Sequence, residues 1–147
     1  MYCLVELETH DLGALNVDFM RLVSTADHPF TRAILPDTSF SQPQLDSGFV
    51  VHVFTARPSP SASSAGVVYE TRMFGPGLGV NEDHVSGSTQ GLLAPHWAAK
   101  LGLGERTMLS HQASTRGGDL WVTFDKEKGL VRLAGRAVKV AEGSICA

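Results

Sequence analysis

The chain has 147 residues, enough for one domain with a full hydrophobic core and too few for two ordinary domains. Hydrophobic residues make up 43% of it and charged residues 18%, which is the balance of a soluble globular protein rather than a disordered one. Because the formal net charge is −3 and the 12 lysines and arginines are scattered, we expect neither nucleic acid nor an anionic membrane as a partner.

The two ends of the chain indicate a cytoplasmic protein. Cys3 and Cys146 lie far apart in the sequence and are expected to be reduced thiols. The first residues reach Glu6 without a basic segment followed by a long apolar one, so they do not resemble a signal peptide. No apolar run approaches the ~18 residues that a membrane span needs.

The first third of the chain predicts one strand, one helix and a long irregular insertion. Residues 2–7 are typical of a strand, and residues 11–23 predict a short helix because Leu15, Phe19 and Leu22 are spaced for one face. Residues 24–47 contain three prolines and many small polar residues, so we interpret them as an irregular insertion.

The middle of the chain predicts two strands, a glycine-rich turn and a helix. Residues 48–55 and 67–74 are rich in β-branched and aromatic residues, and residues 57–65 between them have the composition of a flexible loop. Glycines at 75, 77 and 79 turn the chain. A helix is expected from about residue 87 to 101, with Pro95 inside it and Gly102 as its C-terminal glycine.

The last third has the two-residue period of strands. Short strands are predicted at 108–114, 120–124, 130–133 and 137–140, with a hairpin turn at 126–129. One helix among strands indicates an α+β fold over residues 1–147, with the helix packed on or inside a curled sheet. We expect this helix to be largely buried, with Leu92 and Leu93 among its contacts.

Most of the chemically suggestive residues lie between Arg72 and Ser88. A strand ends there, glycines turn the chain, and Glu82, Asp83 and His84 precede the helix that Gly87-Ser88 would open. Free N–H groups at a helix N-terminus favour an anion, so a substrate carboxylate or phosphate is the expected occupant. Asp83 could exchange a proton with a bound molecule. Alternatively, Asp83 and Ser86 only cap the helix.

Four other kinds of site are excluded by spacing. Gly75-x-Gly77-x-Gly79 is not followed by a helix at the third glycine, as a dinucleotide loop requires, and no lysine completes a phosphate loop. The segment 87–91 lacks the glycine that a nucleophile elbow has two residues before its serine. The histidines at 84, 96 and 111 lack paired metal spacing, so we expect neither a metal nor a cofactor.

Three segments, in order, resemble motifs of the phenazine-biosynthesis-like (PhzF-like) family. They are Phe74-Gly75-Pro76-Gly77, then Glu82-Asp83-His84-Val85-Ser86-Gly87-Ser88, then Gln112-Ala113-Ser114-Thr115-Arg116-Gly117-Gly118. The resemblance implies half of a diaminopimelate-epimerase-like fold, in which each of two pseudo-symmetric domains wraps a mostly antiparallel sheet around a central helix. The chain resembles the second of these domains.

The resemblance also implies roles for residues of the second motif. Asp83 corresponds to the acid of the second domain, Gly87 and Ser88 contact the ligand, and Glu82, His84, Ser86 and Arg116 are expected to assist. The family's main proton-transferring glutamate and a histidine belong to the first domain, which this chain lacks. His84 stands where the family has proline and Ser86 where it has threonine. A histidine side chain can act as an acid or a base, so His84 is either a catalytic group or a surface histidine without a role.

We therefore expect a cofactor-independent isomerase or epimerase that moves a proton on a small carboxylate-bearing metabolite. Asp83, His84 and Glu82 are the candidate catalytic residues, and Gly87, Ser88, Ser86 and Arg116 the candidate binding residues. The active site would be completed by a second copy in a homodimer or by a separate first-domain polypeptide. The alternatives are a binding or assembly domain without catalysis and a truncated gene product.

Overall fold

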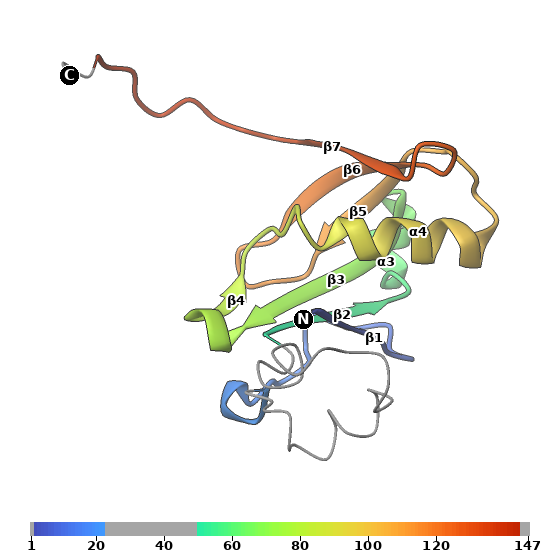
Figure 1. Cartoon of the computed structure of the whole chain (residues 1–147). Coiled ribbons are helices and arrows are strands. Elements are labelled where there is room, and N and C mark those ends of the chain that lie inside the picture. Colours follow the sequence, from blue (N-terminus) through green and yellow to red (C-terminus); the bar gives the residue numbers. More distant parts are fainter. Residues whose placement is uncertain (1, 23–49, 145–147) are drawn as a thin grey trace, which may run out of the picture.

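A computed structural model describes residues 2–22 and 50–144, in which the strands form one sheet (Figure 1). The strands are β1 (Tyr2–Glu6), β2 (Val51–Ala56), β3 (Val67–Gly75), β4 (Val80–Asp83), β5 (Met108–Gln112), β6 (Gly118–Asp125) and β7 (Leu130–Gly135). The sheet order is β1-β2-β3-β5-β6-β7, and β4 pairs with β3 outside this path. The β1–β2 and β3–β5 pairs are parallel and the others antiparallel, so the mostly antiparallel sheet agrees with the expectation.

The helical elements are η1 (Phe19–Leu22), α3 (Pro60–Ser64), η2 (Pro76–Leu78) and α4 (Gln90–Leu101). The helix α4 follows the predicted one closely at its C-terminus, where Gly102 adopts a left-handed conformation with a φ of 62°. Glycine reaches this region without the steric cost that a side chain adds, which is why it ends the helix. Pro95 lies inside α4 without ending it.

One face of the sheet forms the main hydrophobic core with α4. Successive strand residues point to opposite faces, and Val51, Val53 and Thr55 of β2 point toward Trp97 of α4. The Trp97 ring is fully buried, stacks on the Tyr69 ring at a centroid distance of 5.6 Å, and donates its N–H to Thr55 Oγ1 at 2.9 Å. Trp97 therefore joins α4 to both β2 and β3.

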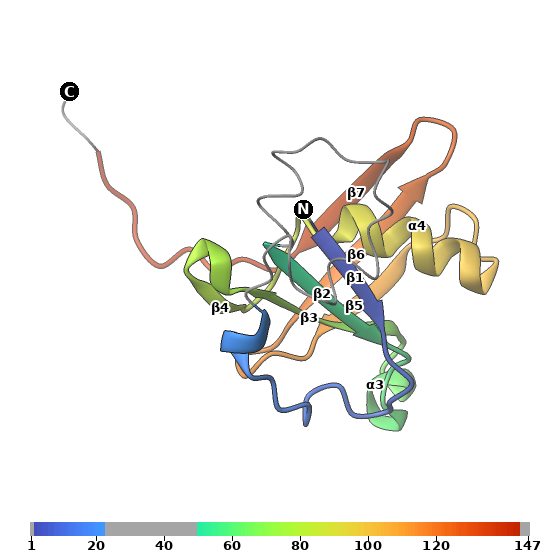
Figure 2. The same ribbon diagram turned by 60° about the horizontal axis from the view of Figure 1, so that its bottom comes forward.

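The expected curling of the sheet around the helix is not observed. The sheet is open, since β1 and β7 are its two edges among the described strands, and its strand direction turns from β1 to β7 (Figure 2). The helix α4 consequently buries only one face. Leu93 is fully buried in the core, as expected of a helix contact, whereas Leu92 is 38% exposed. The two side chains project in different directions because successive helical residues differ by about 100°.

The opposite face of the sheet is covered by the chain that follows β1. The Arg72 guanidinium of β3 donates to the carbonyl oxygens of Leu12 and Leu15, at 3.3 and 2.6 Å. The ring of Phe74, two residues on, lies 5.9 Å from the ring of Phe19. The side chain of Leu12 is fully buried there.

The predicted helix at 11–23 is wrong except at its end. Only the 3-10 turn η1 is helical, and the Asp11 side chain instead accepts a hydrogen bond from the Ala14 amide at 3.0 Å. This local bond offers the backbone an alternative to a helix. The carbonyl groups of Leu12 and Leu15 are then free to bind Arg72, a long-range contact that outweighs the local apolar spacing.

Two further segments differ from the prediction. The predicted loop 57–65 contains α3, because Ser59 accepts the Ala62 amide as an N-cap and Pro60 begins the first turn. The predicted strand at 137–140 is extended chain without a partner strand among the described residues. Val138 and Val140 are 84% and 92% exposed, and Figure 1 shows this segment leading away from the sheet. An apolar alternating run cannot form a ladder without a neighbour.

The insertion predicted at 24–47 and the second cysteine, Cys146, lie outside the described residues. Cys3 is buried in β1, and burial raises the pKa of its thiol, which disfavours the thiolate. None of the helices in the described ranges is both long and apolar enough to cross a bilayer.

Candidate functional site

The strand β4, which the sequence did not indicate, delivers the acidic residues to the start of α4. Residues 76–79 reverse the chain after β3, and Gly79 takes the left-handed conformation that this turn needs, with a φ of 76°. The chain then pairs back on β3, with Asp83 opposite Met73. Glu82 and Asp83 thus end a strand, and the loop 83–86 leads from them toward the helix.

The loop 83–86 is held by the side chains of Gln112 and Ser114. Gln112 accepts the Ser86 amide at 2.8 Å and donates to the Asp83 carbonyl oxygen at 2.6 Å. Ser114 donates its hydroxyl to the His84 carbonyl oxygen at 2.9 Å. Since Gln112 is only 2% exposed, both of its bonds are shielded from water. Two sequence motifs separated by almost 30 residues therefore form one structural unit.

The Asp83 carboxylate faces the loop it begins. Its Oδ2 accepts the hydroxyl of Ser86, which is buried. The alternative, in which Asp83 and Ser86 only cap the helix, is not observed, because α4 has no side-chain cap. The helix begins at Gln90, after a turn closed by the bond from the Gln90 amide to the Gly87 carbonyl oxygen. Asp83 is instead oriented by Ser86.

The turn before α4 leaves three amides available to a ligand. Within the described parts of the chain, the N–H groups of Gly87, Ser88 and Thr89 donate to no acceptor. Such groups at a helix start bind anions. Their position is set by Gln90, which is fully buried and accepts the Tyr69 hydroxyl at 2.6 Å. Burial raises the pKa of Tyr69, so the phenol stays protonated and keeps donating.

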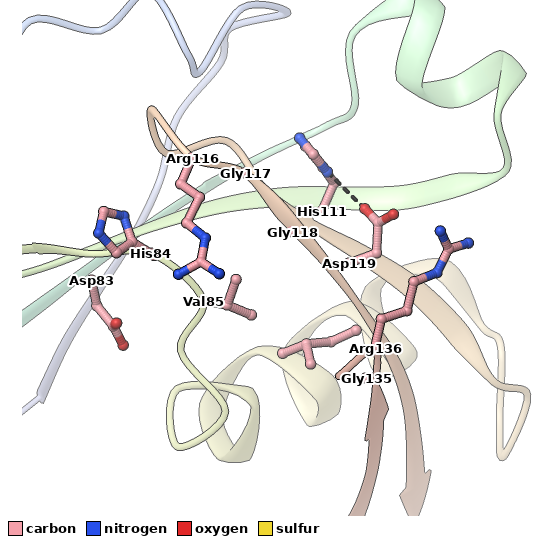
Figure 3. A pocket seen from close by; sticks show the side chains of 11 residues that line it. Asp83, His84, Val85, His111, Arg116, Gly117, Gly118, Asp119, Gly135 and Arg136 are labelled. Carbon is pink, nitrogen blue, oxygen red and sulfur yellow. Dashed lines mark hydrogen bonds and ion pairs between the residues drawn. The ribbon is translucent and has the colours of Figure 1, made fainter. Parts of the chain in front are cut away.

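A pocket of about 710 Å³ lies beside this loop (Figure 3). Its walls come from the loop, the β5–β6 turn and the end of β7, and its lining residues are Asp83, His84, Val85, His111, Arg116, Gly117, Gly118, Asp119, Leu120, Gly135 and Arg136. The structure thus brings together three residues singled out from the sequence, namely Asp83, His84 and Arg116. Glu82, Ser86, Gly87 and Ser88 are not among the lining residues.

The carboxylate of Glu82 is engaged by Arg72. Arg72 Nε and Nη2 bind its two oxygens at 2.7 and 3.0 Å, and the two side chains are 9% and 16% exposed. This paired geometry is the strong form of an arginine–carboxylate contact. Because the same guanidinium binds the Leu12 and Leu15 carbonyl oxygens, Glu82 connects the end of β4 to the segment covering the sheet.

Sequence reasoning did not assign His111, Asp119 or Arg136 to the site. His111 and Asp119 face each other across β5 and β6, and His111 Nδ1 lies 2.8 Å from Asp119 Oδ1 (Figure 3). The antiparallel register alone could have indicated this pair, had the end of β5 and the start of β6 been placed correctly. Arg136 directly follows β7, and no motif in the neighbouring sequence marks it as a site residue.

The two glycines after Arg116 have separate structural reasons. Gly117 has a φ of 70°, a left-handed conformation that strains other residues. Gly118 lies against the loop, and a methyl group there would come within 2.3 Å of Val85 Cγ2. The Gly117-Gly118 pair therefore lets the β5–β6 turn approach the loop that carries Asp83.

We expect Gly118→Ala to lower the free energy of unfolding by about 2 kcal/mol, because the added methyl group must displace Val85 and the loop. Chemical denaturation followed by circular dichroism measures this loss. Gly91→Ala is the matched control, since a methyl group there meets nothing within 4 Å and favours the helix by about 0.5–1 kcal/mol. Equal stability of the two variants would contradict the close contact.

Within residues 2–22 and 50–144, no group of three or more His, Cys, Asp or Glu side chains could hold a metal ion.

The site residues lie in a region shared with known proteins. The family model described as phenazine biosynthesis-like protein (PhzC-PhzF) matches residues 22–143. Phenazine biosynthesis-like domain-containing protein 2 of Mus musculus is 33% identical over 130 residues, which are 87% of this chain and 44% of that protein. An uncharacterized isomerase of Pseudomonas aeruginosa is 42% identical over 77 residues, which are 52% of this chain and 28% of that protein.

Two crystal structures share the fold. A PhzC/PhzF protein of Clostridium difficile aligns with a TM-score of 0.68 at 23% identity, over 99% of this chain and 45% of that one. A PhzF-family protein of Enterococcus faecalis aligns with a TM-score of 0.57 at 22% identity, over 94% and 44% of the two chains. The chain spans less than half the length of these relatives.

Proposed function

Because this chain belongs to the phenazine biosynthesis-like (PhzC-PhzF) family, we propose that it is one half of a cofactor-independent isomerase acting on a small carboxylate-bearing metabolite. In this proposal the chain is the second of two diaminopimelate-epimerase-like domains. The observation that carries it is the loop 83–86, which places a carboxylate held by Ser86 directly before three available helix amides and at the edge of a pocket. The isomerase name of the bacterial relative supports the reaction class.

The chemistry follows from these two neighbouring features. The amides of Gly87, Ser88 and Thr89 bind the substrate carboxylate. Asp83 accepts a proton from the adjacent carbon, and the electrons of the broken C–H bond move toward the bound carboxylate, where the amides stabilise the charge. The proton then returns at another carbon or at the opposite face of the same carbon. Substrate and product therefore contain the same atoms, and no oxidant or reductant is consumed.

Residues around Asp83 have supporting roles in this proposal. The Ser86 hydroxyl donates to the carboxylate and orients it. His84 lies in the pocket wall, where it can assist proton transfer. Glu82, bound to Arg72, positions the loop rather than transferring protons.

A second polypeptide surface completes the site. Gly87 lies against β7, where a methyl group on it would be 3.6 Å from Leu133 Cδ1, and Leu133 is 45% exposed. Together with Leu92, this leaves apolar surface beside the available amides, which favours a docking partner. We propose a first-domain polypeptide or a second copy of this chain as that partner. Sedimentation velocity of the chain distinguishes the two partners. A strict monomer at micromolar concentration would exclude a second copy of this chain as the partner.

The reaction is tested by exchange of carbon-bound hydrogen for deuterium. In D2O, a panel of unsaturated and hydroxylated carboxylic acids is followed by proton NMR with the wild-type chain and with Asp83→Asn. We expect Asp83→Asn to slow exchange by at least about 100-fold, because a positioned acid–base group contributes at least that factor. Acetate should still shift the amide resonances of residues 87–89 in this variant, since its backbone donors are intact.

Glu105→Gln provides the control, because it removes an exposed carboxylate distant in sequence from the loop and should leave the rate unchanged. Exchange that survives in Asp83→Asn would overturn the role of Asp83. A wild-type chain that binds acetate at residues 87–89 but exchanges no hydrogen, also with a first-domain polypeptide present, would support a binding domain without catalysis.

A further inference from the structure

The pocket beside Asp83 has an excess of available positive charge. Of its two carboxylates, Asp83 accepts the Ser86 hydroxyl and Asp119 is bound to His111 Nδ1 at 2.8 Å. Both acids thus have partners inside the protein. The two arginines of the same lining, Arg116 and Arg136, pair with no carboxylate among the residues that the structure describes.

Other arginines of the sheet are paired. Arg72 binds Glu82 at 2.7 Å and Arg132 binds Asp125 at 3.1 Å. Arg132 is the closer comparison, since it lies on β7 only four residues before Arg136. Two unpaired guanidinium groups lining one pocket therefore stand apart from the neighbouring arginines.

Strand order places the two arginines around the same pocket. Arg116 lies in the turn between β5 and β6, and Arg136 follows β7, which pairs with β6. Figure 3 shows them on different segments of the pocket rim. Arg136 lies over the Trp121 ring, with its guanidinium carbon 5.6 Å from the ring centroid. This contact limits the side chain's freedom without using its N–H donors.

The pocket also adjoins the available amides of α4. Asp83, His84 and Val85 line it, and Gly87 follows two residues later. On β7, Leu133 lies where a methyl group on Gly87 would be 3.6 Å from its Cδ1, and Gly135 and Arg136 at the end of this strand segment line the pocket. A small molecule whose first carboxylate is bound by the amides can therefore extend along β7 into the pocket.

We propose that the pocket binds a second carboxylate of the substrate through Arg116 and Arg136, so that the substrate is a dicarboxylate. This inference rests on the proposed function, which assigns the first carboxylate to the amides of residues 87–89. Guanidinium groups present two parallel N–H donors that match a carboxylate, which makes them selective for this group. Asp83 lines the same pocket and precedes the amides in the chain, so in this proposal it accepts the proton of the C–H bond that is broken.

Binding of succinate and acetate to the isolated chain tests the subsite by amide NMR titration. We expect succinate to bind at least about tenfold more tightly than acetate, since charge-assisted hydrogen bonds of this kind contribute at least that factor. In the double variant Arg116→Gln/Arg136→Gln, succinate should bind no better than acetate, while acetate still shifts residues 87–89. Arg106→Gln is the control, because it removes an exposed guanidinium outside the pocket lining and should keep the preference.

The outcomes separate this subsite from the proposed function. Equal affinity for the two acids, with shifts at residues 87–89, overturns the dicarboxylate subsite and leaves the amide site intact. Shifts confined to the arginines and residues 117–119 support the subsite and contradict the amide site. Inorganic phosphate that outcompetes succinate at the arginines would show that the pocket prefers a phosphate, which also contradicts the dicarboxylate. Thermal unfolding of each variant confirms that the fold is retained.

Discussion

Replacing Trp97 by alanine is expected to lower the free energy of unfolding by about 4 kcal/mol, a large fraction of the roughly 5–15 kcal/mol that stabilises a typical domain. The ring is fully buried between α4 and the sheet and stacks on Tyr69 at 5.6 Å. Removal of the ring leaves a cavity, and Thr55 Oγ1 loses the hydrogen bond that the Trp97 ring N–H donates to it. Urea denaturation monitored by circular dichroism measures the loss.

Two variants show whether the burial of Trp97 is responsible. Trp97→Phe keeps most of the stacked ring and should cost roughly half as much as Trp97→Ala. Leu92→Ala removes apolar atoms from the exposed face of the same helix, so its cost should stay near about 0.5 kcal/mol. A similar loss in Leu92→Ala and Trp97→Ala would mean that both faces of α4 are buried, contrary to the open sheet.

Replacing Gln112 by alanine is expected to release the loop that carries Asp83. The change leaves the Ser86 amide and the Asp83 carbonyl oxygen without their partners in a buried position, at 2.8 and 2.6 Å in the native chain. We expect a loss of about 3 kcal/mol in the free energy of unfolding, because each buried group left unpaired costs about 1–3 kcal/mol. Amide hydrogen exchange at Ser86 should become markedly faster.

The conservative variant Gln112→Glu tests the two bonds separately. Its carboxylate still accepts the Ser86 amide but has no proton to donate to the Asp83 carbonyl oxygen at neutral pH. Ser86 should therefore remain protected from exchange while stability falls. Ser114→Ala removes only the bond to the His84 carbonyl oxygen, so we expect a smaller effect. Fast exchange of the Ser86 amide in the wild-type chain would contradict the hydrogen bond by which Gln112 holds the loop.

Local patterns predicted much of the framework because their cause lies within a few residues. The content of β-branched and aromatic residues placed β2 and β3, and the two-residue period placed β6 and β7, each to within a few residues. Gly102 marked the end of α4 because few other residues adopt its left-handed conformation. The motifs that resemble the family pointed to the loop 83–86 and to the 112–118 segment before any contact between them was known.

Local patterns failed where a distant partner decides the conformation. The spacing of Leu15, Phe19 and Leu22 favoured a helix, but the carbonyl groups of residues 12 and 15 bind Arg72 instead. Residues 137–140 alternate as a strand does, yet the described chain provides no neighbouring strand for them. In both cases the sequence carries the apolar spacing but not the identity of the partner.

The same division holds for the candidate site. The sequence by itself determined the residue types before α4, and with them an acid followed by available helix amides. Only the tertiary structure brought His111, Asp119 and Arg136 beside Asp83 and joined Glu82 to Arg72. A helix start is a local property of consecutive residues. A pocket whose walls come from β4, the β5–β6 turn and β7 depends on strand order, which arises from long-range pairing that no short segment encodes.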